Sequence, residues 1–151
     1  MSGADESQLA RFIEAQQPVF ETALAEIKRG RKRSHWMWFI FPQISGLGRS
    51  ETARYFAIQS RAEALAYANH PLLGERLRAC VRALQDLASS NPVEVFGEVD
   101  AVKLRSSLTL FEAATGDSLF SAALERWFAG SRDDATLQLL SAGDRSRPGD
   151  I

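Results

Sequence analysis

The sequence predicts an all-α protein, a single domain of about seven to eight helices packed in crossed (orthogonal) directions rather than simply up and down. Apolar residues recur at helical spacing through most of the chain. Glycine and proline separate one such segment from the next. The clearest apolar series comprises Leu73, Leu77, Cys80, Leu84 and Leu87.

Length and composition indicate one globular domain. The chain has 151 residues, of which 45% are hydrophobic and 25% are charged, and a chain of this size buries a substantial core without covalent cross-links. We expect residues 8–142 to form the domain, with a disordered segment at 1–7 and a flexible tail at 143–151. The net charge of −1 disfavours a general nucleic-acid binder, because such proteins are usually basic throughout.

Cysteine content and hydropathy point to a cytoplasmic protein. The chain has one cysteine, Cys80, so it forms no intramolecular disulfide, which fits a reducing compartment. Its first residues lack the basic and apolar regions of a signal peptide. No apolar run approaches the ~20 residues that span a bilayer, so we expect no membrane partner.

Two helices are expected in the first thirty or so residues. Leu9 and Phe12 lie about one turn apart in a short first helix. A second begins near Pro18, since proline is tolerated in the first turn of a helix. We expect Glu26 on the surface of that helix, and Gly30 at its end, in the left-handed conformation that closes a helix.

The apolar run 36–41 has the aromatic and branched residues typical of a buried strand. A lone strand would leave its backbone polar groups without partners, so a short buried helix with Ser34 as its N-cap is the better interpretation. Trp36 and Trp38 would then point to different sides of the helix, one into the core and the other towards a pocket.

The rest of the chain carries helix start and stop signals in regular succession. The expected starts are Ser50, Ser60, Pro71, Asn91, Asp100, Asp117 and either Asp133 or Asp134. The expected ends lie near Ile58, Ala88, Gly97, Gly116 and Gly130.

The most unusual segment is residues 31–50, RKRSHWMWFIFPQISGLGRS. Cations at the end of a helix complement its macrodipole, which accounts for Lys28 and Arg29. The cations at 31–33 lie beyond the expected helix end, so the dipole explains them less well. Gly46 and Gly48 are too few for a phosphate-binding fingerprint, but Arg49 precedes a helix N-terminus that is a reasonable anion seat.

His35 is the candidate catalytic residue, as a proton-transfer group beside Arg33 and Trp36. The alternative is a histidine that only forms a hydrogen bond near the start of a helix. Cys80 lies in an apolar series and is expected in the core. No metal-binding motif is present in the sequence, and we expect neither a metal nor a cofactor.

A second polar segment, residues 103–109, lies on an expected helix. Arg105 falls next to the buried side, where an arginine usually needs a partner. It either pairs with a carboxylate or joins Lys103 and Ser106 in completing an anion pocket with the first segment.

These features predict a cationic, aromatic-lined pocket that binds a phosphorylated or nucleotide-like small molecule, with or without catalysis. The predicted ligand-binding residues are Arg31, Lys32, Arg33, Trp36, Trp38, Gln43, Arg49, Lys103, Arg105 and Ser106. One alternative is a protein-interaction or regulatory module in which residues 28–33 meet an acidic partner. A less favoured alternative is weak nucleic-acid binding by the same stretch.

The strings RKRSHWMWFIFPQISGLGRS and KLRSSLTLF, with HPLLGERL between them, resemble the DUF1810 family over roughly residues 8–140. The resemblance implies an all-helical fold, which agrees with a helix at 36–41. It implies no established activity, so it indicates where to look and not what happens there.

Overall fold

The computed structural model describes residues 3–145, and in this range the chain is largely helical with no strand longer than a single bridge. The helices are α1 (Gly3–Gln16), α2 (Phe20–Lys28), α3 (Met37–Ile40), α4 (Glu51–Tyr55), α5 (Arg61–Asn69), α6 (Leu73–Gln85), α7 (Pro92–Thr115), α8 (Ser118–Phe128) and α9 (Asp134–Arg145). The predicted all-α fold is therefore confirmed, and the run 36–41 forms the short helix α3 rather than a strand.

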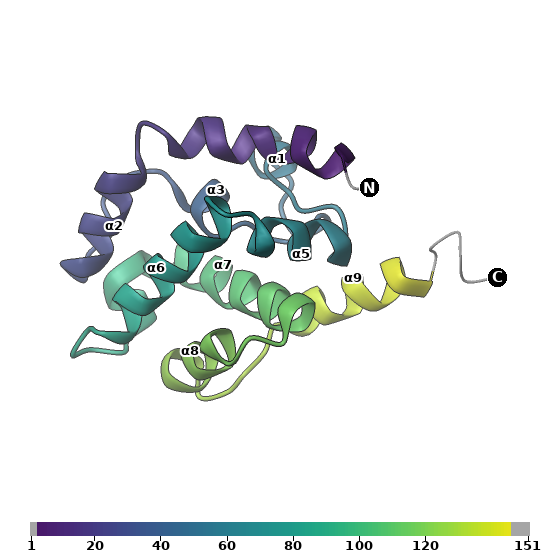
Figure 1. Ribbon diagram of the computed structural model, residues 1–151. Coiled ribbons are helices and arrows are strands. Elements are labelled where there is room, and N and C mark those ends of the chain that lie inside the picture. The colour runs from purple at the N-terminus through teal and green to yellow at the C-terminus, as the bar shows by residue number, and fades with distance from the viewer. Residues whose placement is uncertain (1–2, 146–151) are drawn as a thin grey trace.

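The helices cross one another in several directions around α7 (Figure 1). α7 packs against α5, α8 and α9, while α6 packs against α2, α5 and α8. α1 lies across α3 and α5. An isolated parallel bridge between Ile44 and Ile58 joins the loop after α3 to the segment before α5. This arrangement brings the loop from α2 to α4 against the first half of α7.

A continuous cluster of aromatic and aliphatic side chains fills the space between these helices. Beside the cluster, the buried Gln16 side chain is hydrogen-bonded: its Nε2 donates to the Phe39 carbonyl (2.7 Å) and to the Tyr67 hydroxyl (2.9 Å), which ties α1, α3 and α5 together. Cys80 is fully buried, as predicted, and burial raises the pKa of its thiol to about 12. Such a thiol is an inert core group and not a nucleophile.

Most helices begin at the caps that the sequence predicts. The side chains that accept a backbone N–H at a helix start include Ser50, Ser60, Asn91, Asp117 and Asp133. Four of the expected helix ends, Gly30, Gly97, Gly116 and Gly130, have positive φ angles. The first and last helices extend beyond the predicted domain limits of 8 and 142: α1 begins at Gly3 and α9 ends at Arg145. The remainder of the segments 1–7 and 143–151 lies outside the described residues.

Asp100 does not start a helix as predicted. α7 instead runs from Pro92 to Thr115 with one break at Gly97, whose φ of 83° and ψ of 168° lie in a region that only glycine adopts readily. The Asp100 carboxylate caps no helix and instead pairs with two lysines, Lys32 at 2.8 Å and Lys103 at 3.5 Å. The break thus leaves the Asp100 carboxylate inside the helix rather than at its start, where it pairs with these lysines.

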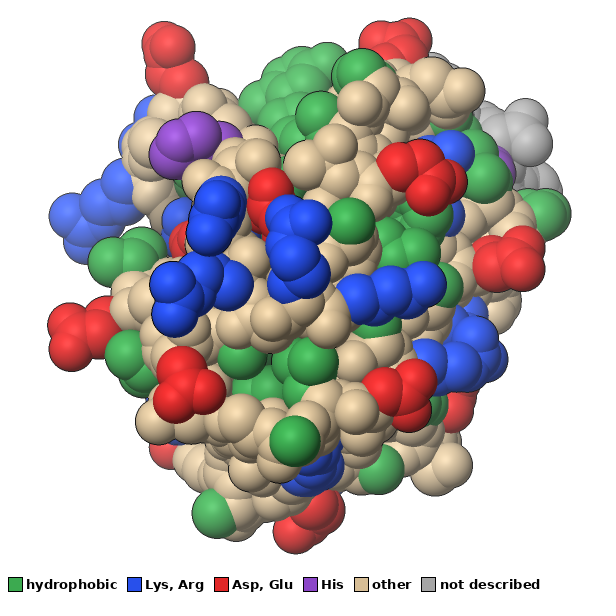
Figure 2. All heavy atoms as spheres, turned by 90° about the vertical axis from the view of Figure 1, so that its left-hand side faces the viewer, with side chains coloured by type: hydrophobic (Ala, Val, Ile, Leu, Met, Phe, Trp, Pro, Cys, Tyr) green, Lys and Arg blue, Asp and Glu red, His purple; other side chains and the backbone are tan. Residues whose placement is uncertain are grey.

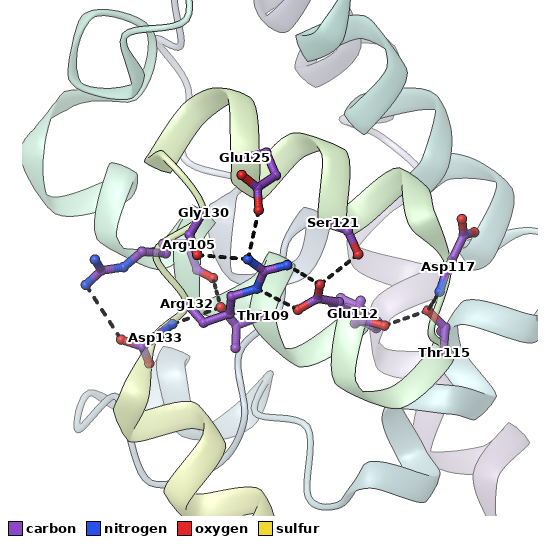
Figure 3. Close-up of polar contacts among 11 residues, drawn as sticks. Arg105, Thr109, Glu112, Thr115, Asp117, Ser121, Glu125, Gly130, Arg132 and Asp133 are labelled. Atoms are coloured by element: carbon purple, nitrogen blue, oxygen red, sulfur yellow. Dashed lines mark hydrogen bonds and ion pairs between the residues drawn. The ribbon is translucent and has the colours of Figure 1, made fainter.

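A polar network fixes the loop between α8 and α9 (Figure 3). Arg132 Nε donates to Glu112 (3.0 Å), while its Nη1 donates to Glu125 (3.3 Å) and to the Gly130 carbonyl (2.8 Å). The hydrogen bond from Arg132, aided by one from the Ser121 hydroxyl, lowers the pKa of Glu112. The network holds this loop against α7 and so sets where α9 begins.

Replacing Gly97 with Ala is expected to destabilise the protein by about 1–3 kcal/mol, because alanine resists this backbone conformation. No atom outside its chain neighbours lies within 4 Å of the position of an added Cβ, so a steric clash does not contribute. Gly143→Ala in α9 is the matched control, since its Cβ also meets nothing within 4 Å. In a helix that change is neutral or stabilising by up to about 1 kcal/mol. Urea unfolding measures both, and equal stability of the two variants would contradict the strained geometry.

Candidate functional site

A buried carboxylate in α2 determines the path of the basic segment that follows. Glu26 is only 3% exposed. Its Oε1 accepts hydrogen bonds from the N–H groups of Arg33 (2.8 Å) and Ser34 (3.0 Å) and from Nε1 of Trp36 (2.9 Å). Its Oε2 accepts from the Ser34 hydroxyl (2.6 Å). Four donors from one short stretch therefore converge on one side chain.

These bonds keep Glu26 ionised. Burial alone would raise the pKa of this carboxyl, but the hydrogen bonds from Ser34, Arg33 and Trp36 lower it to about 2. Two predictions are corrected here. Glu26 is not on the surface, and Ser34 is not the N-cap of α3, because its hydroxyl is used by Glu26 and the helix begins at Met37.

Lys32 points inwards, between two arginines that point outwards. Its N–H donates to the Val95 carbonyl (2.8 Å), and its Nζ lies 2.8 Å from Asp100 and 2.5 Å from the Ser34 carbonyl oxygen. The Lys32 side chain is 8% exposed, and its Nζ lies 5.0 Å from the centre of the Trp36 ring. Trp36 itself is fully buried. Both predicted ligand-binding residues are therefore parts of the interior.

Arg29, Arg31 and Arg33, with Gly30 and Glu94, line an open hollow of about 410 Å³, which we call the basic hollow. All three arginines are exposed. Within residues 3–145 none of them forms an ion pair. Figure 2 shows Lys and Arg side chains gathered near the middle of the face on which α2 ends. Positive charge is thus concentrated here, where, among the described residues, Glu94 is the one carboxylate that lines the hollow.

A second hollow, of about 430 Å³, lies between the loop after α3 and the α7–α9 side of the molecule. We call it the mixed hollow, because one lysine and one aspartate line it together with apolar residues. Its lining residues are Gln43, Leu47, Gly48, Val99, Val102, Lys103, Ser106 and Asp133. The two predicted segments, 31–50 and 103–109, therefore meet at this place.

Charges alternate around the mixed hollow. Lys103 Nζ lies 3.5 Å from Asp100 and 4.8 Å from the centre of the Trp38 ring, which is half-buried beneath it. Asp133 lies 3.9 Å from the Arg105 guanidinium, whose Nη1 also donates to Ser131 (3.3 Å). Pairing of Arg105 with a carboxylate was one of the two alternatives that the sequence left open, and it is the one observed. With one lysine and one aspartate in its lining, the hollow as a whole is close to neutral.

The residues predicted for a single pocket are divided between two hollows, and Asp100, which lines neither, pairs with both Lys32 and Lys103. Arg31 and Arg33 belong to the basic hollow, and Gln43, Lys103 and Ser106 to the mixed hollow. His35 and Arg49 are exposed and line neither of them.

Sequence reasoning missed several residues in or near these hollows: Glu26, Leu47, Glu94, Val99, Asp100, Val102 and Asp133. For Glu26 a signal existed, since it lies three residues after Ala23 and one before Ile27, both fully buried in α2. For Val99 and Val102 a signal existed in their spacing of three, but such pairs usually face the core.

A third hollow, of about 380 Å³, lies beside the start of α5 and is lined in part by Arg61 and Asp144. Arg61 Nη2 donates to Asp144 (2.9 Å), and its Nη1 donates to the Ala113 carbonyl (2.9 Å). Its cation is therefore already matched by a carboxylate, which makes this hollow a weaker candidate for an anionic ligand.

Between Gly3 and Arg145 no three or more His, Cys, Asp or Glu side chains are grouped so as to hold a metal ion. The helices of this part of the chain are also too short or too polar to cross a bilayer.

Comparison with known proteins identifies relatives but no activity. The family described as "Protein of unknown function (DUF1810)" matches residues 6–140. The crystal structure of the conserved hypothetical protein Rv1873 from Mycobacterium tuberculosis is similar, with 44% sequence identity and a TM-score of 0.86. The match covers 88% of this chain and 96% of the mycobacterial chain. No curated protein matches the chain.

Replacing Glu26 with Gln preserves its shape but removes the charge from a group that accepts four hydrogen bonds. We expect the free energy of unfolding at pH 7 to fall by about 1–3 kcal/mol. Glu14→Gln, which changes an exposed carboxylate on α1, is the control and should change stability by less than about 0.5 kcal/mol.

The same pair of proteins tests the pKa of Glu26. Its folded pKa, about 2, lies below the ordinary value of 4.5, so its stabilising contribution is complete above pH 4.5 and disappears as the pH falls towards 2. The stability difference between the wild type and Glu26→Gln should therefore narrow through this window in urea titrations. A difference that stays constant from pH 7 to pH 3 would be inconsistent with an ionised, buried Glu26.

Proposed function

This chain belongs to the DUF1810 family, and we propose that it binds a phosphorylated or nucleotide-like small molecule through the basic hollow, with or without catalysis. The observation that carries the proposal is the set of three exposed arginines around one hollow, none of which is ion-paired within the described residues. Arginine presents a planar fork of donors that matches the oxygens of a phosphate group.

The arginine side chains, and not the backbone, would make the contacts. The N–H groups of Arg29, Gly30 and Arg31 donate to carbonyls at the end of α2, and that of Arg33 donates to the Glu26 carboxylate. A phosphate therefore meets no free backbone donor at these positions and depends on guanidinium groups. Because Glu26 fixes the backbone at Arg33, the side chain beyond it starts from an ordered position.

The mixed hollow supports phosphate binding less well, since Asp133 lines it and Asp100 holds Lys103. Of the predicted ligand-binding residues, Arg31 and Arg33 therefore remain at the centre of the proposal. His35 lies two residues after Arg33 and is exposed, and it stays the candidate proton-transfer group if a reaction occurs. A cytoplasmic location is part of the same proposal.

A protein-interaction module is the second candidate, because the same unpaired arginines are exposed on an open surface rather than in a deep cleft. An acidic segment of a partner would meet them in the way that a phosphate does. The two candidates differ in the size of the ligand and not in the chemistry of the contact.

Binding of inorganic phosphate, pyrophosphate, AMP and ATP, measured by thermal shift and calorimetry at constant ionic strength, tests the first candidate. The double variant Arg31→Ala/Arg33→Ala is expected to weaken binding by at least about tenfold, since a hydrogen bond to a charged group contributes roughly 1.5–3 kcal/mol. Arg54→Ala, which removes an exposed cation from α4, is the matched control and should leave affinity unchanged.

If Arg54→Ala and the double variant lose the same affinity for these compounds, the loss is explained by net charge alone. That result would contradict a specific anion site. If no phosphate compound binds, but the wild type retains an acidic protein that Arg31→Glu/Arg33→Glu does not, the second candidate is supported instead.

A further inference from the structure

We propose that the mixed hollow binds a free amino acid with an apolar side chain, in its zwitterionic form. This inference is independent of phosphate binding in the basic hollow. It begins from three features of the hollow: a cation, an anion and an apolar wall that solvent reaches. Its volume of about 430 Å³ falls within the roughly 300–1,000 Å³ typical of small-molecule sites.

The cation of the hollow has unused bonding capacity. Lys103 carries three N–H donors, and within the described residues its ion-pair partner is Asp100 at 3.5 Å. Asp100 is nearer to Lys32, at 2.8 Å, so it only partly satisfies Lys103. The ring of Trp38 supports the ammonium from one side. A carboxylate entering the hollow would complete the hydrogen bonding of Lys103.

The anion of the hollow also has unused capacity, on one of its two oxygens. Asp133 Oδ2 accepts from the N–H (3.0 Å) and hydroxyl (2.6 Å) of Thr136 at the start of α9. Oδ1 faces Arg105 at 3.9 Å, which is longer than a hydrogen bond. The Asp133 N–H donates to Thr109 (3.0 Å), so the residue is held in place, as Figure 3 shows. Oδ1 thus keeps its ion pair with Arg105 but accepts no hydrogen bond within the described residues, so it has room to accept one from an ammonium group.

The apolar wall is exposed to a degree that the fold does not require. Val99 is 71% exposed and Val102 is 56% exposed, one turn apart on α7, with Leu47 on the facing loop. Neither the core nor another helix covers these two valines in the described part of the chain. A branched or aromatic side chain of a ligand would remove this surface from water.

Other ligand classes fit the hollow less well. A phosphate would meet the negative charges of Asp133 and Asp100, whereas an uncharged apolar molecule would cover Lys103 and Asp133 without giving either a partner. A zwitterion offers a carboxylate to the lysine and an ammonium to the aspartate. Gln43 and Ser106, which also line the hollow, supply further polar atoms.

Calorimetry and thermal shift with L-leucine, 4-methylpentanoate and 3-methylbutylamine test this assignment. The two analogues have the same branched chain as leucine, but each lacks one charged group. We expect leucine to stabilise the wild type and to bind at least about tenfold more tightly than either analogue. Valine and phenylalanine should bind as well, while inorganic phosphate should not compete with any of them.

Two variants identify the partner of each charge. Asp133→Asn retains a side chain that caps α9 and is expected to weaken leucine binding about tenfold while leaving 4-methylpentanoate unaffected. Lys103→Met keeps an unbranched chain over Trp38 and should weaken leucine and 4-methylpentanoate but not 3-methylbutylamine. Arg54→Ala is the control and should bind leucine as the wild type does.

The assignment is overturned if none of the three amino acids stabilises the wild type at about 10 mM. It is equally overturned if leucine and its single-charge analogues bind alike, or if neither variant changes the affinity for leucine. Circular dichroism of each variant establishes that it is folded, so that a loss of binding reports on the hollow.

Discussion

The hydrogen-bonded carboxylate of Glu26 is the interaction on which the rest of this surface depends. An ionised group buried at 3% exposure would be costly without partners. Here the partners are the N–H groups of Arg33 and Ser34, the Ser34 hydroxyl and the indole of Trp36. The lowered pKa of Glu26 corresponds to about 3 kcal/mol of folding free energy at neutral pH. The same bonds that stabilise the protein therefore determine where its most basic segment runs.

The basic segment itself contains one inward charge, Lys32, and a carboxylate of α7 neutralises it. Lys32 pairs with Asp100 and lies near the Trp36 ring, while its neighbours Arg31 and Arg33 remain outside. The three consecutive cations therefore lie in two different environments. The middle one joins the loop to α7, and the outer two remain exposed.

Sequence patterns predicted the elements whose signals are local. Asp117 and Asp133 cap helices as expected, since a cap depends on residues within one turn. The inward turn of Glu26 and Lys32 could not be predicted in the same way, because it depends on donors and acceptors that meet only in three dimensions. Asp100 was wrongly predicted to be an N-cap for a related reason. Aspartate is a common N-cap residue, but the break in the helix lies at Gly97, so Asp100 is inside α7. Local chemistry was therefore a good guide to helices and a poor guide to which charges remain available.

The division of the predicted pocket into two hollows has an electrostatic explanation. In the basic hollow Glu94 faces three arginines, whereas in the mixed hollow Lys103 and Asp133 occur together. Asp100 pairs through its two oxygens with Lys32 and Lys103, so the charges of these two lysines do not add to that of the arginines. A count of cations along the sequence treats all of these lysines and arginines as one region of positive charge. The folded protein instead pairs some of them with carboxylates from distant turns, and the three arginines of the basic hollow are among the cations that have no ion pair within the described residues.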